Sequence, residues 1–190
     1  MSIILASKSP RRQELLHLLG VDFTIETADI DEHMDPALPA KQEVMRVSAL
    51  KAAKIADLHP DDLVIASDTI VVVDGKILGK PRDEADAFSM LRLLSGRGHE
   101  VMTGLCVRQA DCEVRDAVIT KVFFRELSDA EIRAYIATGE PMDKAGAYGI
   151  QGKASIFVTG IEGDYFSVMG LPVSRLCQVL RTFGIPVLDV

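Results

Sequence analysis

The sequence predicts an α/β fold, because short apolar segments typical of strands alternate along the chain with segments of helical spacing. The clearest strand spans Leu63–Val73, where Val and Ile dominate and neither face is consistently polar, as in a strand buried on both faces. The 190 residues are 48% hydrophobic and 26% charged, which is ordinary for a soluble globular protein with a large core. This length fits one domain with one or two lobes, and we assign residues 1–190 to it.

The helices are predicted from apolar spacing together with their start and stop signals. Ser9 fits the N-cap of the first helix, Pro10 fits its first position, and Gly20 fits the residue after its end. Asp83 fits the N-cap of a later helix, and Ser128 opens a capping box. The predicted helices span residues 13–19, 39–58, 84–94, 128–138 and 173–183.

The other strands are predicted from short apolar or β-branched runs between turn residues. Asp74-Gly75 is typical of a type I′ hairpin turn, which joins the long strand to a short return strand. A polar turn at Ala110 separates two longer strands, and Gly163 marks the tip of a final hairpin. These strands span residues 3–6, 23–26, 77–78, 99–107, 113–124, 155–161 and 165–168.

Asp68 is out of place in the long strand, because a buried carboxylate is costly unless it is paired, hydrogen-bonded or bound to a metal. Ser67 and Thr69 flank it, so the polar groups form a local cluster. Two interpretations stay open on this stretch alone. The carboxylate belongs to a functional site, or it caps or hydrogen-bonds a neighbouring loop.

The start of the first helix is a candidate anion site. Ser7, Ser9, Arg11 and Arg12 surround the positive end of this helix, directly after a strand. Free N–H groups, hydroxyl donors and two guanidinium groups are the donors that phosphate needs. The alternative is an ordinary capped helix with arginines on its surface.

Lysines and acidic residues elsewhere are harder to interpret from pattern alone. The acidic segment 29–32 leaves the end of a strand, where it is either solvated or part of a metal site. Lys51 and Lys54 lie in a long helix, and composition predicts that both are solvated. Lys80 follows the hairpin after Asp68, so we expect the two residues to lie near each other.

The segment 143–152 contains three glycines, which indicates special backbone angles or close packing. It matches neither the phosphate-binding P-loop nor the dinucleotide-binding glycine pattern. It is either a structural loop or a segment that presents Lys144, Tyr148 and Gln151 to a ligand.

The remaining composition excludes several classes of function. A formal net charge of −7 argues against nucleic acid as a partner, although it permits a small anionic ligand. The three cysteines form no CxxC pair, and the four histidines lack metal-ligand spacing. No apolar run is long enough for a membrane span, and the first residues do not form a signal peptide. We therefore expect a cytoplasmic protein with no membrane partner.

Five stretches, taken together, resemble the Maf family of nucleoside triphosphate pyrophosphatases. They occur in the order typical of that family and cover nearly the whole chain. The stretches are Ala6-Ser-Lys-Ser-Pro-Arg-Arg12, Ser67-Asp-Thr69, Gly79-Lys-Pro-Arg-Asp83, Asp143-Lys-Ala-Gly-Ala-Tyr-Gly-Ile-Gln-Gly152 and Val168-Met-Gly-Leu-Pro-Val173. The pattern at Arg12, Thr69 and Gln151 is similar to the branch that acts on dTTP and UTP. The branch linked to 7-methyl-GTP has Gln at the position of Thr69.

The resemblance implies both a fold and an activity. The fold is an elongated mixed β-sheet flanked by helices, with two lobes and a central cleft, as in inosine-triphosphatase-like proteins. The activity is hydrolysis of dTTP and UTP, and of modified pyrimidine triphosphates, to the nucleoside monophosphate and pyrophosphate. The family is also linked to inhibition of septum formation in cell division.

The resemblance also implies roles for individual residues. Asp68 is the proton acceptor, and Glu32 and Asp68 are the oxygen ligands expected for Mg²⁺ or Mn²⁺. The implied substrate-binding residues are Ser7, Ser9, Arg11, Arg12, Lys51, Thr69, Lys80 and Gln151. The implied partner is therefore a small-molecule nucleoside triphosphate, and the sequence leaves a homodimer open.

Two other functions remain open at this point. One is a nucleotide-binding regulator of septum formation without turnover. The other is a phosphomonoesterase with an Asp nucleophile, which needs a second Asp where this chain has Ile70.

Overall fold

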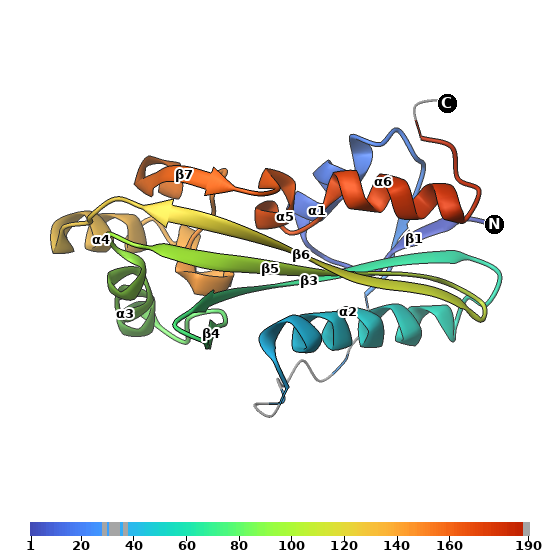
Figure 1. Ribbon diagram of the computed structural model, residues 1–190, viewed down its shortest axis with the longest axis horizontal. Helices are drawn as coiled ribbons and strands as arrows, with labels where there is room; N and C mark the ends of the chain where they lie inside the picture. The colour runs from blue at the N-terminus through green and yellow to red at the C-terminus, as the bar shows by residue number, and fades with distance from the viewer. Residues whose placement is uncertain (28–29, 31–34, 36–37, 188–190) are drawn as a thin grey trace. The chain divides into compact units, whose positions relative to one another are not determined.

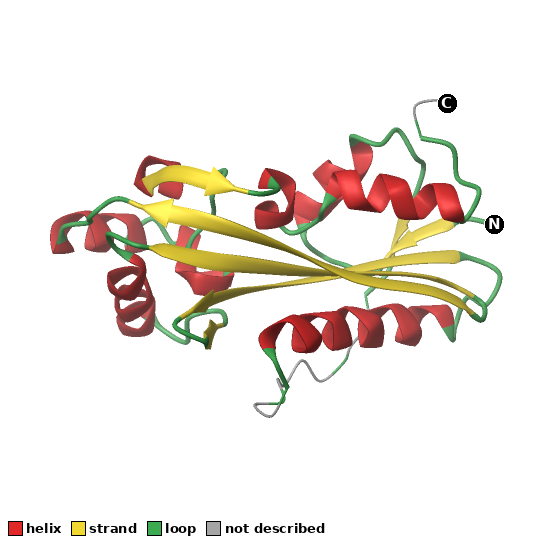
Figure 2. Cartoon of the chain, in the orientation of Figure 1, coloured by secondary structure: helices red, strands yellow, loops and turns green. Residues whose placement is uncertain are grey.

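The computed structural model describes residues 1–27, 30, 35 and 38–187. In this part of the chain, seven strands form one mixed sheet flanked by helices, as predicted (Figures 1 and 2). The strand order is β2-β1-β3-β5-β6-β7, and β4 pairs with β3 off this path. The strands are β1 (Ile3–Leu5), β2 (Thr24–Ile25), β3 (Leu63–Val73), β4 (Lys76–Leu78), β5 (Gly98–Gln109), β6 (Cys112–Phe124) and β7 (Val158–Glu162).

The α-helices are α1 (Pro10–His17), α2 (Ala40–Ala56), α3 (Glu84–Leu94), α4 (Asp129–Ile136), α5 (Tyr165–Met169) and α6 (Val173–Thr182). Three short 3₁₀ helices lie between α4 and β7, namely η1 (Glu140–Asp143), η2 (Ala145–Ala147) and η3 (Lys153–Phe157). None of the helices in the described ranges is long and apolar enough to cross a membrane.

The chain divides into two compact units, which agrees with the prediction of two lobes. Unit 1 comprises Met1–Asp68, Thr103–Val118 and Gly170–Val190, and unit 2 comprises Thr69–Met102 and Ile119–Met169. The chain passes from unit 1 to unit 2 within β3, directly after Asp68. The cleft between the lobes stays a prediction.

One part of the core of unit 1 forms where α2 packs on β1, β3 and β5. In Figure 1, α2 covers one face of this part of the sheet, whereas α1 and α6 lie on the other. Strand β1 pairs in parallel with both β2 and β3, so the sheet brings residues 4 and 64 side by side. The buried contacts under α2 come from Ile4, Ala6, Ala49, Ala52, Ile55, Ala56, Val64, Ala66 and Cys106. A Cβ at Gly104 would lie 2.3 Å from the carbonyl oxygen of Val44, so this close approach of α2 requires glycine.

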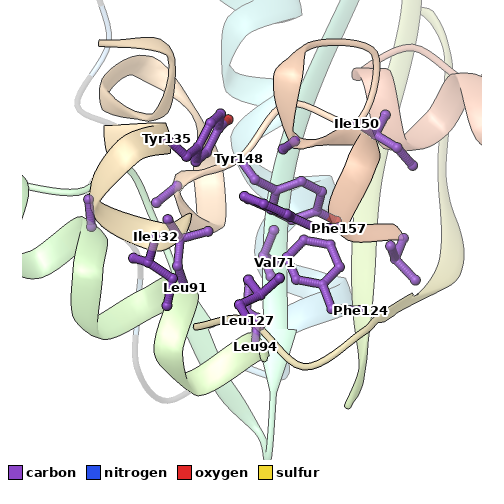
Figure 3. Close-up of a cluster of buried hydrophobic side chains, with 14 of the residues drawn as sticks. Val71, Leu91, Leu94, Phe124, Leu127, Ile132, Tyr135, Tyr148, Ile150 and Phe157 are labelled. Carbon is purple, nitrogen blue, oxygen red and sulfur yellow. The ribbon is translucent and has the colours of Figure 1, made fainter. Parts of the chain in front are cut away.

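The core of unit 2 contains most of the buried aromatic rings. Figure 3 shows Leu91 and Leu94 of α3 near Phe124 of β6, with Tyr148 and Phe157 beside them. The rings of Phe124 and Tyr148 meet edge to face, with their centroids 4.8 Å apart. Tyr148 and Phe157 anchor the segment from η1 to η3 in this core, and the segment includes the whole glycine-rich stretch 143–152.

Most of the predicted elements form, and the local signals explain why. Asp74 and Gly75 both have positive φ, as a type I′ turn requires. The Ser128 capping box is complete, and Asp83 accepts a hydrogen bond from the backbone N–H of Asp86.

The predicted final hairpin is wrong. Its second strand is the helix α5, and the first part of its first strand is the 3₁₀ helix η3. Asp164 causes this outcome, because its side chain accepts a hydrogen bond from the backbone N–H of Phe166 at 2.9 Å. Its carbonyl oxygen accepts a bond from the hydroxyl of Ser167 at 2.7 Å. Local bonds from a capping Asp therefore outweigh the strand preference of Tyr165 and Phe166.

Candidate active site

Asp68 lies at the end of the unit 1 part of β3, and its partner is Lys51 of α2. The Lys51 ammonium donates a hydrogen bond to Asp68 Oδ1 at 2.7 Å. Both residues are buried, with exposed fractions of 8% and 9%. The carboxylate is therefore compensated by a charge, and a loop-capping role is not needed to explain its burial.

The expectation that Lys51 is solvated is wrong, whereas Lys54 is indeed exposed. Helical spacing explains the difference, because Lys51 follows Val44 and Val47 on the buried stripe of α2 and precedes Ile55. The position of Lys51 on this stripe is a signal in the sequence that composition alone does not reveal.

Ser67, next to Asp68, holds a distant part of the chain. Its hydroxyl lies 2.8 Å from the carbonyl oxygens of both Gly104 and Gly170. Gly170 has a φ of 118°, a conformation that favours glycine. The Met-Gly-Leu-Pro stretch thus places a backbone carbonyl beside the strand that carries Asp68, a link that sequence reasoning did not find.

Arg12 binds the same carbonyl group. Its Nε donates to the Gly170 carbonyl oxygen at 2.8 Å, and its Nη1 donates to Ser7 Oγ at 3.2 Å. Ser7 Oγ also accepts a bond from the backbone N–H of Ser9 at 3.2 Å. The Gly170 carbonyl therefore joins the start of α1 to the Ser67–Asp68 step of β3.

These bonds bear on the alternative that α1 is only a capped helix. Ser9 occupies the N-cap position, but in the described structure its side chain makes no capping bond. Arg12 is tied to two other segments and is not a surface residue pointing into solvent. Arg11 is partly buried in the first turn of α1. The geometry favours a prearranged group of donors over an ordinary cap.

The remaining predicted substrate residues belong to unit 2. Thr69 is partly buried in β3, whereas Lys80 and Gln151 are exposed in turns. The backbone N–H of Gly146 donates to the Gly79 carbonyl at 3.0 Å, so the turn of Lys80 contacts the glycine-rich segment. The expected proximity of Lys80 to Asp68 stays a prediction, because the two residues lie in different units.

The predicted metal ligands are only partly covered by the structure. Glu32 lies outside the described residues, so Asp68 is the one of the two ligands whose surroundings are known. Among the described residues, no group of three or more His, Cys, Asp or Glu side chains could hold a metal ion. The donor chemistry still fits Mg²⁺ or Mn²⁺, because Mg²⁺ commonly uses one or two carboxylates together with water and substrate phosphates.

The structure is similar to that of the Ham1 protein of Staphylococcus aureus, with a TM-score of 0.53 and 15% sequence identity. The match covers 97% of this chain and 100% of that chain. At this identity the likeness shows the fold alone, which is the predicted mixed α/β class.

The sequence comparison defines the family. Residues 2–183 match the family described as Maf-like protein, and this chain belongs to that family. A relative from Syntrophomonas wolfei is 50% identical over 187 residues, which cover 97% of this chain and 98% of the relative. A relative from Koribacter versatilis is 50% identical over 185 residues, covering 97% and 96% of the two chains. Both relatives are named dTTP/UTP pyrophosphatase.

Proposed function

We propose that this protein is a nucleoside triphosphate pyrophosphatase that hydrolyses dTTP and UTP between the α and β phosphates. The choice of substrate is supported by relatives of that name that are 50% identical over nearly the whole chain. The observation that carries the mechanism is the buried carboxylate of Asp68, held by Lys51. Its neighbour Ser67 shares the Gly170 carbonyl with Arg12 of α1. The products are the nucleoside monophosphate and pyrophosphate.

The positive end of α1 is the proposed site for the phosphates. A triphosphate carries close to four negative charges, which the net negative charge of the protein repels. Arg11 and Arg12, with the hydroxyls of Ser7 and Ser9, offset this repulsion and orient the phosphates. The contacts of Arg12 with Gly170 and Ser7 favour one orientation of its guanidinium group before the substrate binds, which reduces the entropic cost of binding.

Asp68 is the proposed base. Water attacks the α-phosphorus, its proton passes to Asp68, and the bond to the pyrophosphate leaving group breaks. Lys51 contacts Oδ1, so we assign Oδ2 to the water or to a metal ion. The ion pair also restricts the rotation of the carboxylate, which keeps it aligned for proton transfer.

A divalent cation is part of this proposal, with Asp68 and Glu32 as the residues that would hold it. When bound, Mg²⁺ or Mn²⁺ would neutralise phosphate charge and polarise the α-phosphorus. The side chains at the start of α1 would orient the phosphates, and Asp68 would orient the attacking water.

We assign the rest of the nucleotide to residues of unit 2. Gln151 has both a donor and an acceptor, which suits the edge of a uracil or thymine ring. Thr69 and Lys80 are further proposed contacts, and modified pyrimidine triphosphates are proposed substrates of the same kind. A cytoplasmic location and a link to septum formation accompany this function as predictions.

A product-resolved screen of nucleoside triphosphates with Mg²⁺ or Mn²⁺ tests the proposal. We expect equal amounts of monophosphate and pyrophosphate from dTTP and UTP, and slower turnover of other nucleotides. Binding without turnover would instead favour the regulator of septum formation. Release of orthophosphate as the first product would favour the phosphomonoesterase.

A further inference from the structure

We propose that Tyr135 and Glu140 are positioning residues that hold the turn bearing Gln151 and thereby set the preference for uracil over cytosine. This inference rests on the proposed function, because it concerns how Gln151 contacts the base. The sequence pattern singled out neither residue, and the proposed mechanism gives neither a role.

The two side chains bind the backbone on both sides of Gln151. The Tyr135 hydroxyl accepts a hydrogen bond from the backbone N–H of Gly149 at 3.2 Å and donates to Glu140 Oε1 at 2.9 Å. Glu140 Oε2 accepts a bond from the backbone N–H of Lys153 at 3.0 Å. Lys153, two residues after Gln151, is therefore bonded directly to the Glu140 carboxylate, and Gly149, two residues before it, is linked to the same carboxylate through the Tyr135 hydroxyl.

The segment between these anchors is a tight turn. The backbone N–H of Gly152 donates to the Gly149 carbonyl at 3.0 Å, which places Ile150 and Gln151 at the corners. Ile150 is buried in the core of unit 2, whereas Gln151 is exposed. The turn thus directs one side chain inward and leaves the other available to a ligand.

Close packing leaves this turn little freedom. A Cβ at Gly152 would lie 2.3 Å from Glu140 Oε1, so the backbone lies directly against the carboxylate. Lys144 crosses the same region, because its ammonium donates to the Glu140 carbonyl at 2.7 Å. A Cβ at Gly149 would lie 2.7 Å from Lys144 Cε. A side chain at Gly149 or Gly152 would therefore displace the end of Lys144 or of Glu140.

The surroundings of Tyr135 keep its hydroxyl in the role of donor to Glu140. The ring is buried and meets Phe157 edge to face, with centroids 5.2 Å apart. Burial raises the pKa of the Tyr135 phenol above its ordinary value, so the group stays protonated at neutral pH. The Tyr135–Glu140 bond therefore persists over the pH range in which the enzyme would act.

A fixed turn matters because an amide side chain is not selective by itself. Gln151 can present either its oxygen or its NH₂ group, so it could pair with uracil or with cytosine after rotation. The distance and direction at which the backbone holds the amide then decide which edge it reaches well. Restricting the backbone also lowers the entropy lost on binding.

The experiment compares kcat/KM for UTP and CTP in Tyr135→Phe and Glu140→Gln. Tyr165→Phe and Glu162→Gln are matched controls. They repeat the same two substitutions at exposed side chains of unit 2. We expect the UTP to CTP ratio to fall about tenfold in the two test variants, mainly through KM for UTP, as for loss of one oriented hydrogen bond. The control variants should keep the wild-type ratio.

A double-mutant cycle with Gln151→Ala separates positioning from general stability. Tyr135→Phe should not lower the ratio further in a Gln151→Ala background, because both changes act through the same contact. An equal loss with both nucleotides, or a fall in the ratio that persists without Gln151, would overturn the inference. If Tyr135→Phe does not fold, Glu140→Gln decides by the same criterion.

The two proposals can fail separately. Wild-type protein that does not release pyrophosphate from UTP contradicts the proposed function, and this inference with it. Active wild-type protein whose test variants keep the UTP to CTP ratio contradicts this inference alone.

Discussion

Asp68 and Lys51 form a buried pair in which each charge depends on the other. The sequence predicts that Asp68 needs a partner, because a lone carboxylate is costly in an apolar strand. It does not identify the partner by proximity, since the two residues are 17 positions apart in the chain, with a helix-to-strand connection between them. The helical spacing of α2 narrows the choice to Lys51, because Lys54 falls outside the buried stripe.

Lys51→Met should destabilise the protein and abolish its activity. The variant leaves the Asp68 carboxylate buried without its charge partner, and we expect the free energy of unfolding to fall by about 3 kcal/mol in urea titrations. Replacing both residues, as Lys51→Met with Asp68→Leu, should restore most of the stability but none of the turnover. A single variant as stable as the wild type would contradict the pairing.

At the scale of elements, Arg12 connects the start of α1 to the segment before α6, through the carbonyl group of Gly170. The sequence predicts the strand, the cap position and the helix, because each has a local signal. It does not predict that Arg12 and Ser67 share the carbonyl of Gly170, because Gly170 lies 158 residues from Arg12 in the chain. Long-range contacts of this kind need the packed structure.

Arg12→Lys should raise KM and lower kcat together, by on the order of tenfold each, because lysine keeps the charge but lacks the planar guanidinium. Steady-state kinetics with UTP measure this effect, with Arg133→Lys on the exposed side of α4 as the control. If Arg12→Lys changes only the thermal stability and leaves the kinetics as in the wild type, α1 is an ordinary capped helix.

The helix α5 is an element whose type the sequence pattern predicts wrongly, as a strand. Aromatic and β-branched residues at 165–168 favour a strand on composition. Asp164 supplies a helix cap directly before them, and this local bond decides the outcome. The capping signal was present in the sequence, but the strand preference of the neighbouring side chains masked it.

For the whole molecule, the sequence predicts the α/β class and most element positions, and the resemblance to the Maf family implies the division into two lobes. The comparisons confirm the predicted family, with relatives that match nearly the whole chain. What the sequence does not predict is the tertiary hydrogen bonding that organises the site, such as the bonds of Ser67, Tyr135 and Glu140. These bonds join residues that are close only after the sheet and helices have packed.

Acid stability tests the core of unit 2. Burial lowers the pKa of His99 to about 4, whereas the unfolded chain titrates near 6.5. Between these values the unfolded chain binds more protons, so stability is lost as pH falls from about 6.5 towards 4. We expect His99 to contribute about 2 kcal/mol to the loss of stability between pH 7 and pH 5.

Urea titrations at both pH values measure this loss, and His99→Leu provides a comparison that cannot titrate at this position. Between pH 7 and pH 5, the free energy of unfolding of His99→Leu should fall by about 2 kcal/mol less than that of the wild type. An unchanged loss in His99→Leu would mean that other groups cause the acid sensitivity.

Pyrophosphate release from UTP by wild-type and Asp68→Asn protein tests the central claim most directly. With Mg²⁺ present, we expect the wild type to release one pyrophosphate for each UMP formed. We expect kcat of Asp68→Asn to fall roughly 100-fold or more, as for loss of a general base, in a protein with an unchanged circular dichroism spectrum. The exposed Asp111→Asn should behave as the wild type. A fully active Asp68→Asn variant would contradict the account.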